Sequence, residues 1–125
     1  MDQKPKYTFE NEARSAGDLP PVTDTGNYEQ KRAPAGTVIA LLNQAHDQQR
    51  QGKPERAAAV LERALRIDPR NARLWSELAQ IRLQQGKLEQ AESLAAKSNA
   101  LAKDDEEIKQ HNANIIKQAR YLRGG

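Results

Sequence analysis

The chain has 125 residues, which suits one domain with an appended segment better than two domains. It contains no cysteine, and this excludes a disulfide framework and a thiolate metal site. Aromatic residues make up only 4% of the sequence, so Ala, Leu and Ile must form the core, as in closely packed helices. The formal charge is +3, but basic and acidic side chains are interleaved, a pattern that favours solvated helix surfaces over nucleic-acid binding.

Residues 1–36 show no apolar periodicity and carry a net charge of −1, from five Lys or Arg against six Asp or Glu. We expect this segment to be a disordered tether, because its apolar surface is too small to offset the entropy of ordering. The sequence displays neither a signal peptide nor an apolar run of roughly 20 residues that could span a bilayer. The chain is therefore expected to be cytosolic, or a mature form whose targeting segment has been removed.

Residues 37–123 are predicted to form an all-α domain of five helices joined by short connections. The first helix begins at Thr37, a plausible N-cap, and ends at Gly52. The second opens at Pro54, which is favoured in a first turn, and ends just before Pro69.

Asn71 is predicted to cap the third helix, which ends at Gly86, and a fourth helix follows over 88–102. Asp104 and Glu107 have the spacing of a capping box at the start of the fifth helix. The apolar stripe of this helix is expected to cover the preceding helix pair. The stripe consists of Ile108, Ile115, Ala119 and Leu122.

An internal repeat, with a period of about 34 residues, underlies this order. Aligning residues 38–69 with 72–103 gives six identities in 32 positions. The alanines of this alignment are expected where paired helices cross closely, and the glycines where a first helix ends. Leu41 and Trp75 are the corresponding large residues, and both are expected to fill the space under the turn.

The pattern resembles the tetratricopeptide repeat family. The matching positions are Leu41, Ala45, Gly52, Ala57, Ala64 and Pro69 in the first unit, and Trp75, Leu78, Ala79, Gly86 and Ala91 in the second. The resemblance implies two helix-turn-helix repeats (37–69 and 70–103), a capping helix (104–123) and a non-enzymatic surface for a protein partner.

The segments 61–67, 82–86 and 97–102 are also similar to a group of small proteobacterial envelope lipoproteins with one repeat domain. One of these activates a bifunctional penicillin-binding protein in pseudomonads. The resemblance implies a periplasmic protein, tethered to the outer membrane by a lipid anchor that this chain does not contain, which activates peptidoglycan synthesis. The alternatives are a cytosolic adaptor or scaffold with an unknown protein partner and, less favoured, a basic RNA-associated factor. A monomer is expected.

In this fold the partner is expected on the inner surface, which the first helix of each pair and the last helix line. The residues expected to project there are Ile39, Leu42, His46, Gln49, Arg73, Ser76, Gln80, Leu83, Gln110 and Asn114. An exposed Leu42 or Leu83 among polar groups is typical of an interface, although neighbours could also bury either one. No catalytic residue, cofactor or metal site is predicted, because both histidines are isolated and helix capping accounts for the acidic run 104–107.

Overall fold

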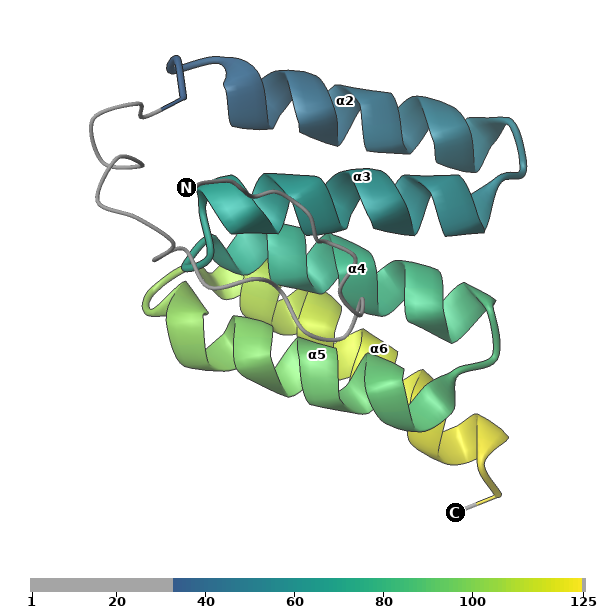
Figure 1. Ribbon diagram of the computed structural model, residues 1–125. Coiled ribbons are helices and arrows are strands. Elements are labelled where there is room, and N and C mark those ends of the chain that lie inside the picture. The colour runs from purple at the N-terminus through teal and green to yellow at the C-terminus, as the bar shows by residue number, and fades with distance from the viewer. Residues whose placement is uncertain (1–32, 125) are drawn as a thin grey trace, which may run out of the picture. The chain divides into compact units, whose positions relative to one another are not determined.

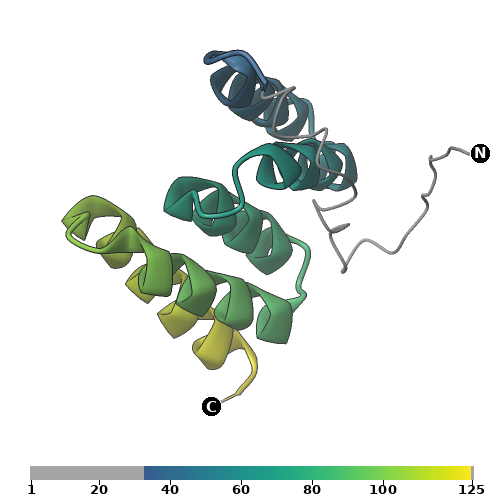
Figure 2. The ribbon, with the colours of Figure 1, turned by 60° about the vertical axis from the view of Figure 1, so that its left-hand side comes forward.

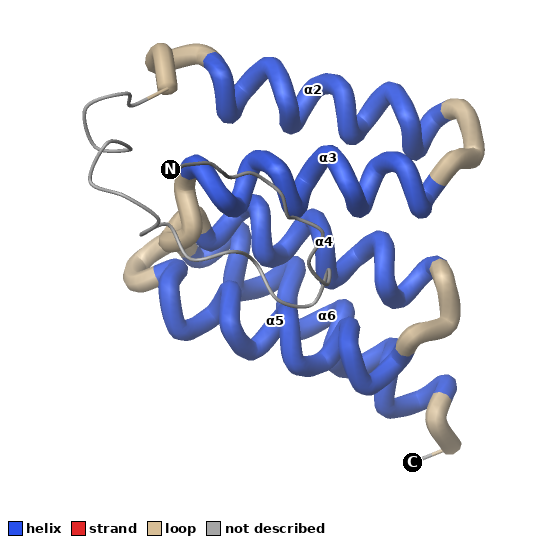
Figure 3. Tube along the Cα trace, in the orientation of Figure 1, coloured by secondary structure: helices blue, strands red, loops and turns tan. Residues whose placement is uncertain are grey.

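The structure, a computed structural model, describes residues 33–124, and five helices follow one another in that part of the chain (Figure 1). They are α2 (Thr37–Arg50), α3 (Pro54–Ile67), α4 (Ala72–Gln84), α5 (Leu88–Ala102) and α6 (Glu106–Leu122). Only helices and short connections occur within residues 33–124, which confirms the expected all-α class (Figure 3). Most of the expected tether, residues 1–32, lies outside the described residues.

The turns that end α2 and α4 have the same geometry at equivalent places in the two repeats. Gly52 has a φ of +73° and Gly86 a φ of +78°, the left-handed conformation that glycine adopts without steric cost. In the first turn the Lys53 amide donates to the Gln48 carbonyl oxygen at 2.8 Å. In the second turn the Lys87 amide donates to the Arg82 carbonyl oxygen at 2.9 Å. The two glycines therefore reverse the chain, so that α3 and α5 return antiparallel to α2 and α4.

Three of the five predicted helix starts are confirmed, and Leu88 of α5 is one of them. Pro54 occupies the first turn of α3, and Asn71 caps α4 through its side-chain oxygen, which accepts from the amide of Arg73 at 3.0 Å. The other two are wrong by one residue. The N-cap of α2 is Gly36, so Thr37 already lies inside the helix, and the N-cap of α6 is Asp105 rather than Asp104. The Asp105 carboxylate accepts from the Ile108 amide at 3.1 Å.

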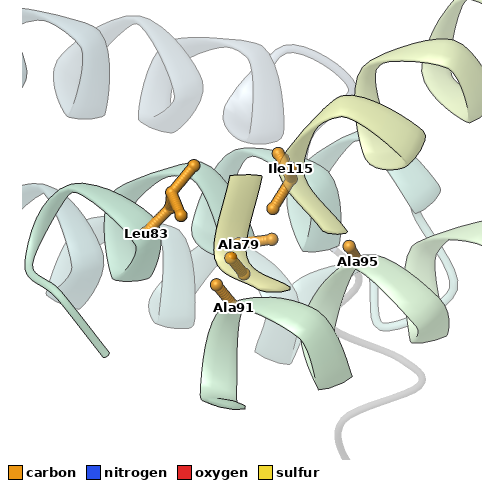
Figure 4. Close-up of a cluster of buried hydrophobic side chains, with 6 residues drawn as sticks. Ala79, Leu83, Ala91, Ala95 and Ile115 are labelled. Carbon is orange, nitrogen blue, oxygen red and sulfur yellow. The ribbon is translucent and has the colours of Figure 1, made fainter. Parts of the chain in front are cut away.

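Alanine makes the close helix crossings, as the repeat predicts. Ala45 and Ala57, in the first pair, and Ala79 and Ala91, in the second, are all fully buried. Ala79 and Ala91 share one apolar cluster with side chains from α6 (Figure 4). Without a side chain beyond Cβ, these positions let two helix axes approach, and leucines and isoleucines fill the remaining core.

The capping helix α6 packs against both α4 and α5, at the end of the stack away from α2 (Figure 2). Ile115 and Ala119 are buried in the shared cluster, as expected of the apolar stripe. Ile108 is only half-buried, and Leu122 is 59% exposed, so the prediction that Leu122 belongs to the buried stripe is wrong. The buried stripe begins instead at Asn112, a polar residue.

Asn112 joins a buried hydrogen-bond network across three helices. Its side-chain nitrogen donates to the Ser98 hydroxyl oxygen at 2.8 Å and to the Asn99 side-chain oxygen at 2.9 Å. The Ser98 hydroxyl in turn donates to the Ala72 carbonyl oxygen at 2.8 Å. Because a buried polar group without a partner is costly, this chain of bonds fixes the position of α6 against α4 and α5.

Trp75 is less buried than its place in the repeat suggests. Its counterpart Leu41 is buried, but Trp75 is only half-buried. The indole N–H donates to the Pro69 carbonyl oxygen at 2.8 Å, so the ring lies against the connection between the two repeats. The Lys97 ammonium lies 5.7 Å from the ring centroid. Trp75 therefore contacts and stabilises the connection between the repeats, and it does not fill the core.

Candidate protein-interaction surface

The first helices of the repeats, together with α6, form the inner surface. The starts of α4 and α6, Ala72 and Glu106, are one repeat length apart, so α6 occupies the place of a first helix in a third unit. α4 is the middle helix of the three. His46 links it to α2, and Leu83 joins Ile115 of α6 in one cluster.

A carboxylate lies at the centre of this surface. Glu77, on α4, has one carboxylate oxygen 3.2 Å from His46 Nε2 on α2 and the other 3.5 Å from Arg73 Nε, one turn earlier on α4. All three side chains remain partly in contact with solvent, so the contacts add little to stability. The contacts bring the His46 imidazole, the Glu77 carboxylate and the Arg73 guanidinium together at the solvent-accessible surface.

Apolar and amide groups surround this polar centre. Ile39, a large apolar residue of α2, is 65% exposed. Seven of the other expected residues are accessible as well. Leu42, His46, Gln49 and Gln80 are half-buried, and Arg73, Gln110 and Asn114 are exposed.

Two residues of the expected set do not reach the surface. Ser76 is 3% exposed and Leu83 is 7% exposed, so the expectation that they project toward a partner is wrong. Both lie on α4, which has a neighbouring first helix on each side. Leu42 has the same place in the repeat as Ser76 but lies on the outermost helix, α2, and is therefore only half-buried.

The structure adds a second feature that sequence reasoning did not identify. A shallow open groove runs along α6 beside α5, and we call it the cap groove. It is lined by Asn99, Ala113, Ile116, Lys117, Arg120 and Tyr121. Two signals in the sequence were available, since Ile116 and Tyr121 are apolar positions that do not belong to the buried stripe of α6.

Within residues 33–124, no group of His, Asp and Glu side chains has the arrangement of a metal site. No helix in the same part of the chain is both long and apolar enough to cross a bilayer. The accessible groups of the inner surface are suited to hydrogen bonds, ion pairs and apolar contact with a polypeptide.

Comparison with known proteins identifies the class. A tetratricopeptide repeat family model matches residues 48–115, which is more than half of the chain. The chain belongs to the tetratricopeptide repeat family, and its fold is that of a protein-interaction module.

A solved structure gives a more particular likeness. The chain is similar to the globular C-terminal domain of LpoP from P. aeruginosa, with 40% sequence identity and a TM-score of 0.70. The similarity covers 71% of this chain and 84% of the LpoP domain. Among curated protein sequences, none matches this chain.

Proposed function

We propose that this chain is the non-enzymatic interaction module of an envelope lipoprotein that activates a bifunctional penicillin-binding protein, and so stimulates peptidoglycan synthesis. The observation that carries the proposal is the 40% identity to the LpoP domain over most of both chains. The envelope lipoproteins that the sequence resembles include such an activator. Identity at this level across most of a folded domain supports a shared partner class better than the repeat fold alone does.

The proposed mechanism is allosteric. A helical module without catalytic groups can accelerate a synthase only by binding its active conformation more tightly than its idle one. The inner surface supplies the contacts: Ile39 offers apolar area, and the His46–Glu77–Arg73 group offers polar recognition. In this proposal the module works in the periplasm, and a lipid anchor outside this chain tethers it to the outer membrane.

The proposal is tested by reconstituting glycan polymerisation with the purified bifunctional penicillin-binding protein of the same organism and its lipid-linked precursor. Addition of this chain is expected to raise the initial rate of polymerisation and to give saturable binding. Absence of both binding and stimulation would overturn the proposed function, and a cytosolic adaptor role would then be favoured.

A matched pair of variants assigns the effect to the inner surface. Ile39 on α2 and Ile67 at the end of α3 are both exposed isoleucines, but only Ile39 lies on a first helix. Ile39→Glu is expected to weaken synthase binding about tenfold, as the loss of an apolar anchor does at protein interfaces. Ile67→Glu introduces the same charge on a second helix and is expected to leave binding unchanged. Equal binding by the two variants would exclude the inner surface as the contact.

A further inference from the structure

The cap groove has the geometry of a helix-binding site, and the first sign is a set of three alanines at the same place in three successive units. Ala45, Ala79 and Ala113 follow one another at intervals of one repeat length along α2, α4 and α6. The first two are fully buried, because the second helix of each pair crosses over them. Ala113 is exposed, since within residues 33–124 no helix crosses α6 as α3 crosses α2.

Two large apolar or aromatic side chains line the groove together with Ala113. Ile116 is half-buried and packs at the edge of the shared cluster, and Tyr121 is 79% exposed. Asn99 of α5 forms the opposite wall. A small residue at the centre with larger apolar side chains beside it is the surface on which α3 and α5 pack elsewhere in this fold.

The charges of the groove specify what kind of helix fits. Lys117 and Arg120 line it, and no acidic residue does. Among residues 33–124, no carboxylate lies within ion-pair distance of Lys117. Arg120 pairs with Glu92, which also contacts Arg123, and Arg123 lies near Glu89 as well. The groove therefore presents positive charge near the C-terminal end of α6.

An antiparallel helix would place its first turn at this basic end. First turns favour acidic side chains, because the N-terminus of a helix carries partial positive charge. The second helices of this chain follow the same rule, since α3 has Glu55 and α5 has Glu89 in the first turn. An antiparallel helix with acidic residues in its first turn therefore matches the groove in both direction and charge.

We propose that the cap groove binds an amphipathic helix of the partner protein, antiparallel to α6, with acidic residues in its first turn and a small residue facing Ala113. The bound helix completes a third repeat in trans. The inference rests on the proposed function in taking the partner to be the synthase, but it concerns the side of α6 next to α5, which adjoins the inner surface at Gln110 and Asn114. A second copy of this chain is the competing occupant.

The test compares two variants of Ala113 with a control variant on α3 for binding to the purified synthase. Ala113→Glu puts a charged, bulky side chain where the helices must approach, and it is expected to weaken binding at least about tenfold. Ala113→Ser keeps the position small and is expected to bind like the wild type. Ala59→Glu makes the same substitution at an exposed position of α3, a second helix outside both surfaces, and it is also expected to bind like the wild type. Thermal unfolding of each variant verifies that the fold is kept.

The outcomes separate the two proposals. If the wild type binds and Ala113→Glu binds equally well, the inference is overturned while the proposed function stands. If the wild type does not bind the synthase, the proposed function fails and the inference with it. Analytical ultracentrifugation measures the oligomeric state of the wild type and of Ala113→Glu. A wild-type dimer that Ala113→Glu converts to a monomer would show that a second copy occupies the groove, which also overturns the inference.

Discussion

Trp75 is held at the connection between the two repeats by the hydrogen bond from its indole N–H to the Pro69 carbonyl oxygen. Trp75→Phe keeps an aromatic ring at this half-buried position but removes the donor. The free energy of unfolding is expected to fall by about 1 kcal/mol, the usual net value of one hydrogen bond. Urea unfolding measures the change. A loss above about 3 kcal/mol would indicate a fully buried core aromatic instead and would contradict a role at the connection between the repeats.

Glu62, on α3, is a carboxyl group whose pKa is raised in the folded protein. Burial between α3 and α4 raises its pKa above the usual 4.5, and the Arg82 guanidinium, with a nitrogen 3.3 Å from Glu62 Oε2, only partly opposes this. The folded state therefore holds the proton more tightly than the unfolded state. The stability that Glu62 contributes is full below its usual pKa and is lost as the pH rises through the raised value.

Glu62→Gln removes this titration and keeps the side-chain volume. The free energy of unfolding of the wild type, relative to the variant, is expected to increase as the pH falls from neutral toward the usual pKa of a glutamate. Urea unfolding of both proteins at several pH values measures the difference, in which the contributions of all other groups cancel. Parallel pH profiles for the two proteins would contradict the assignment.

At the scale of the element, α6 completes the core of the second repeat. It supplies Ile115 and Ala119 to the cluster around Ala79. Its Asn112 donates a hydrogen bond to the buried Ser98 hydroxyl oxygen. Truncation after Lys103 exposes this surface. Burial of one Ile side chain alone is worth about 1.5–3 kcal/mol, and stability changes of this size in a domain this small shift the melting temperature by about 4–8 °C per kcal/mol.

The truncated protein is therefore expected to melt at least about 15 °C lower, or to lose its cooperative transition, in circular dichroism. Truncation after Leu122 is the control, because it removes only Arg123 and two glycines from the exposed end of the chain. A cooperative transition at the wild-type temperature after loss of α6 would show that two repeats suffice.

Much of the helix pattern could be predicted because local chemistry decides it. Pro54 fits only a first turn, and Gly52 and Gly86 supply the left-handed conformation that ends a helix. The errors arose where two neighbouring residues were both chemically suitable. Asp104 and Asp105 can each cap a helix, and tertiary packing, which fixes Asn112 against Ser98, selects the second.

The inner surface was less predictable, because exposure depends on elements far away in the sequence. Leu42 and Ser76 share one place in the repeat, yet α4 has helices on both sides and α2 does not. Ser98 and Asn112 are polar residues that are nevertheless fully buried, and they are linked by hydrogen bonds to each other, to the Ala72 carbonyl oxygen and to Asn99. The cap groove was missed for the related reason that Ala113 has a buried counterpart in each of the other two units.

At the scale of the whole molecule, a short stack of repeats has two ends with different chemistry. At the α2 end the exposed Ile39 lies on a helix whose first turn contains no acidic residue. At the α6 end Lys117 and Arg120 surround apolar side chains. Repeats stabilise only their neighbours, so both ends can bind a partner without disturbing the centre of the stack.

The buried residues of the repeats indicate what residues 1–32 contribute to stability. The buried apolar residues of the described part extend from Leu41 to Ala119. Deletion of residues 1–32 is therefore expected to leave the melting temperature within about 2 °C of the wild type, since changes away from the core are worth about 0.5 kcal/mol or less.

The deletion is also expected to leave stimulation of the detergent-solubilised synthase unchanged, because in solution a tether does not limit access to the partner. The activity should depend on the tether only when both proteins are anchored to membranes. In that arrangement the length of the tether sets the effective concentration of the module at the synthase. A lower melting temperature after the deletion would indicate that residues 1–32 pack on the repeats, and lost stimulation in solution would place part of the binding site within them.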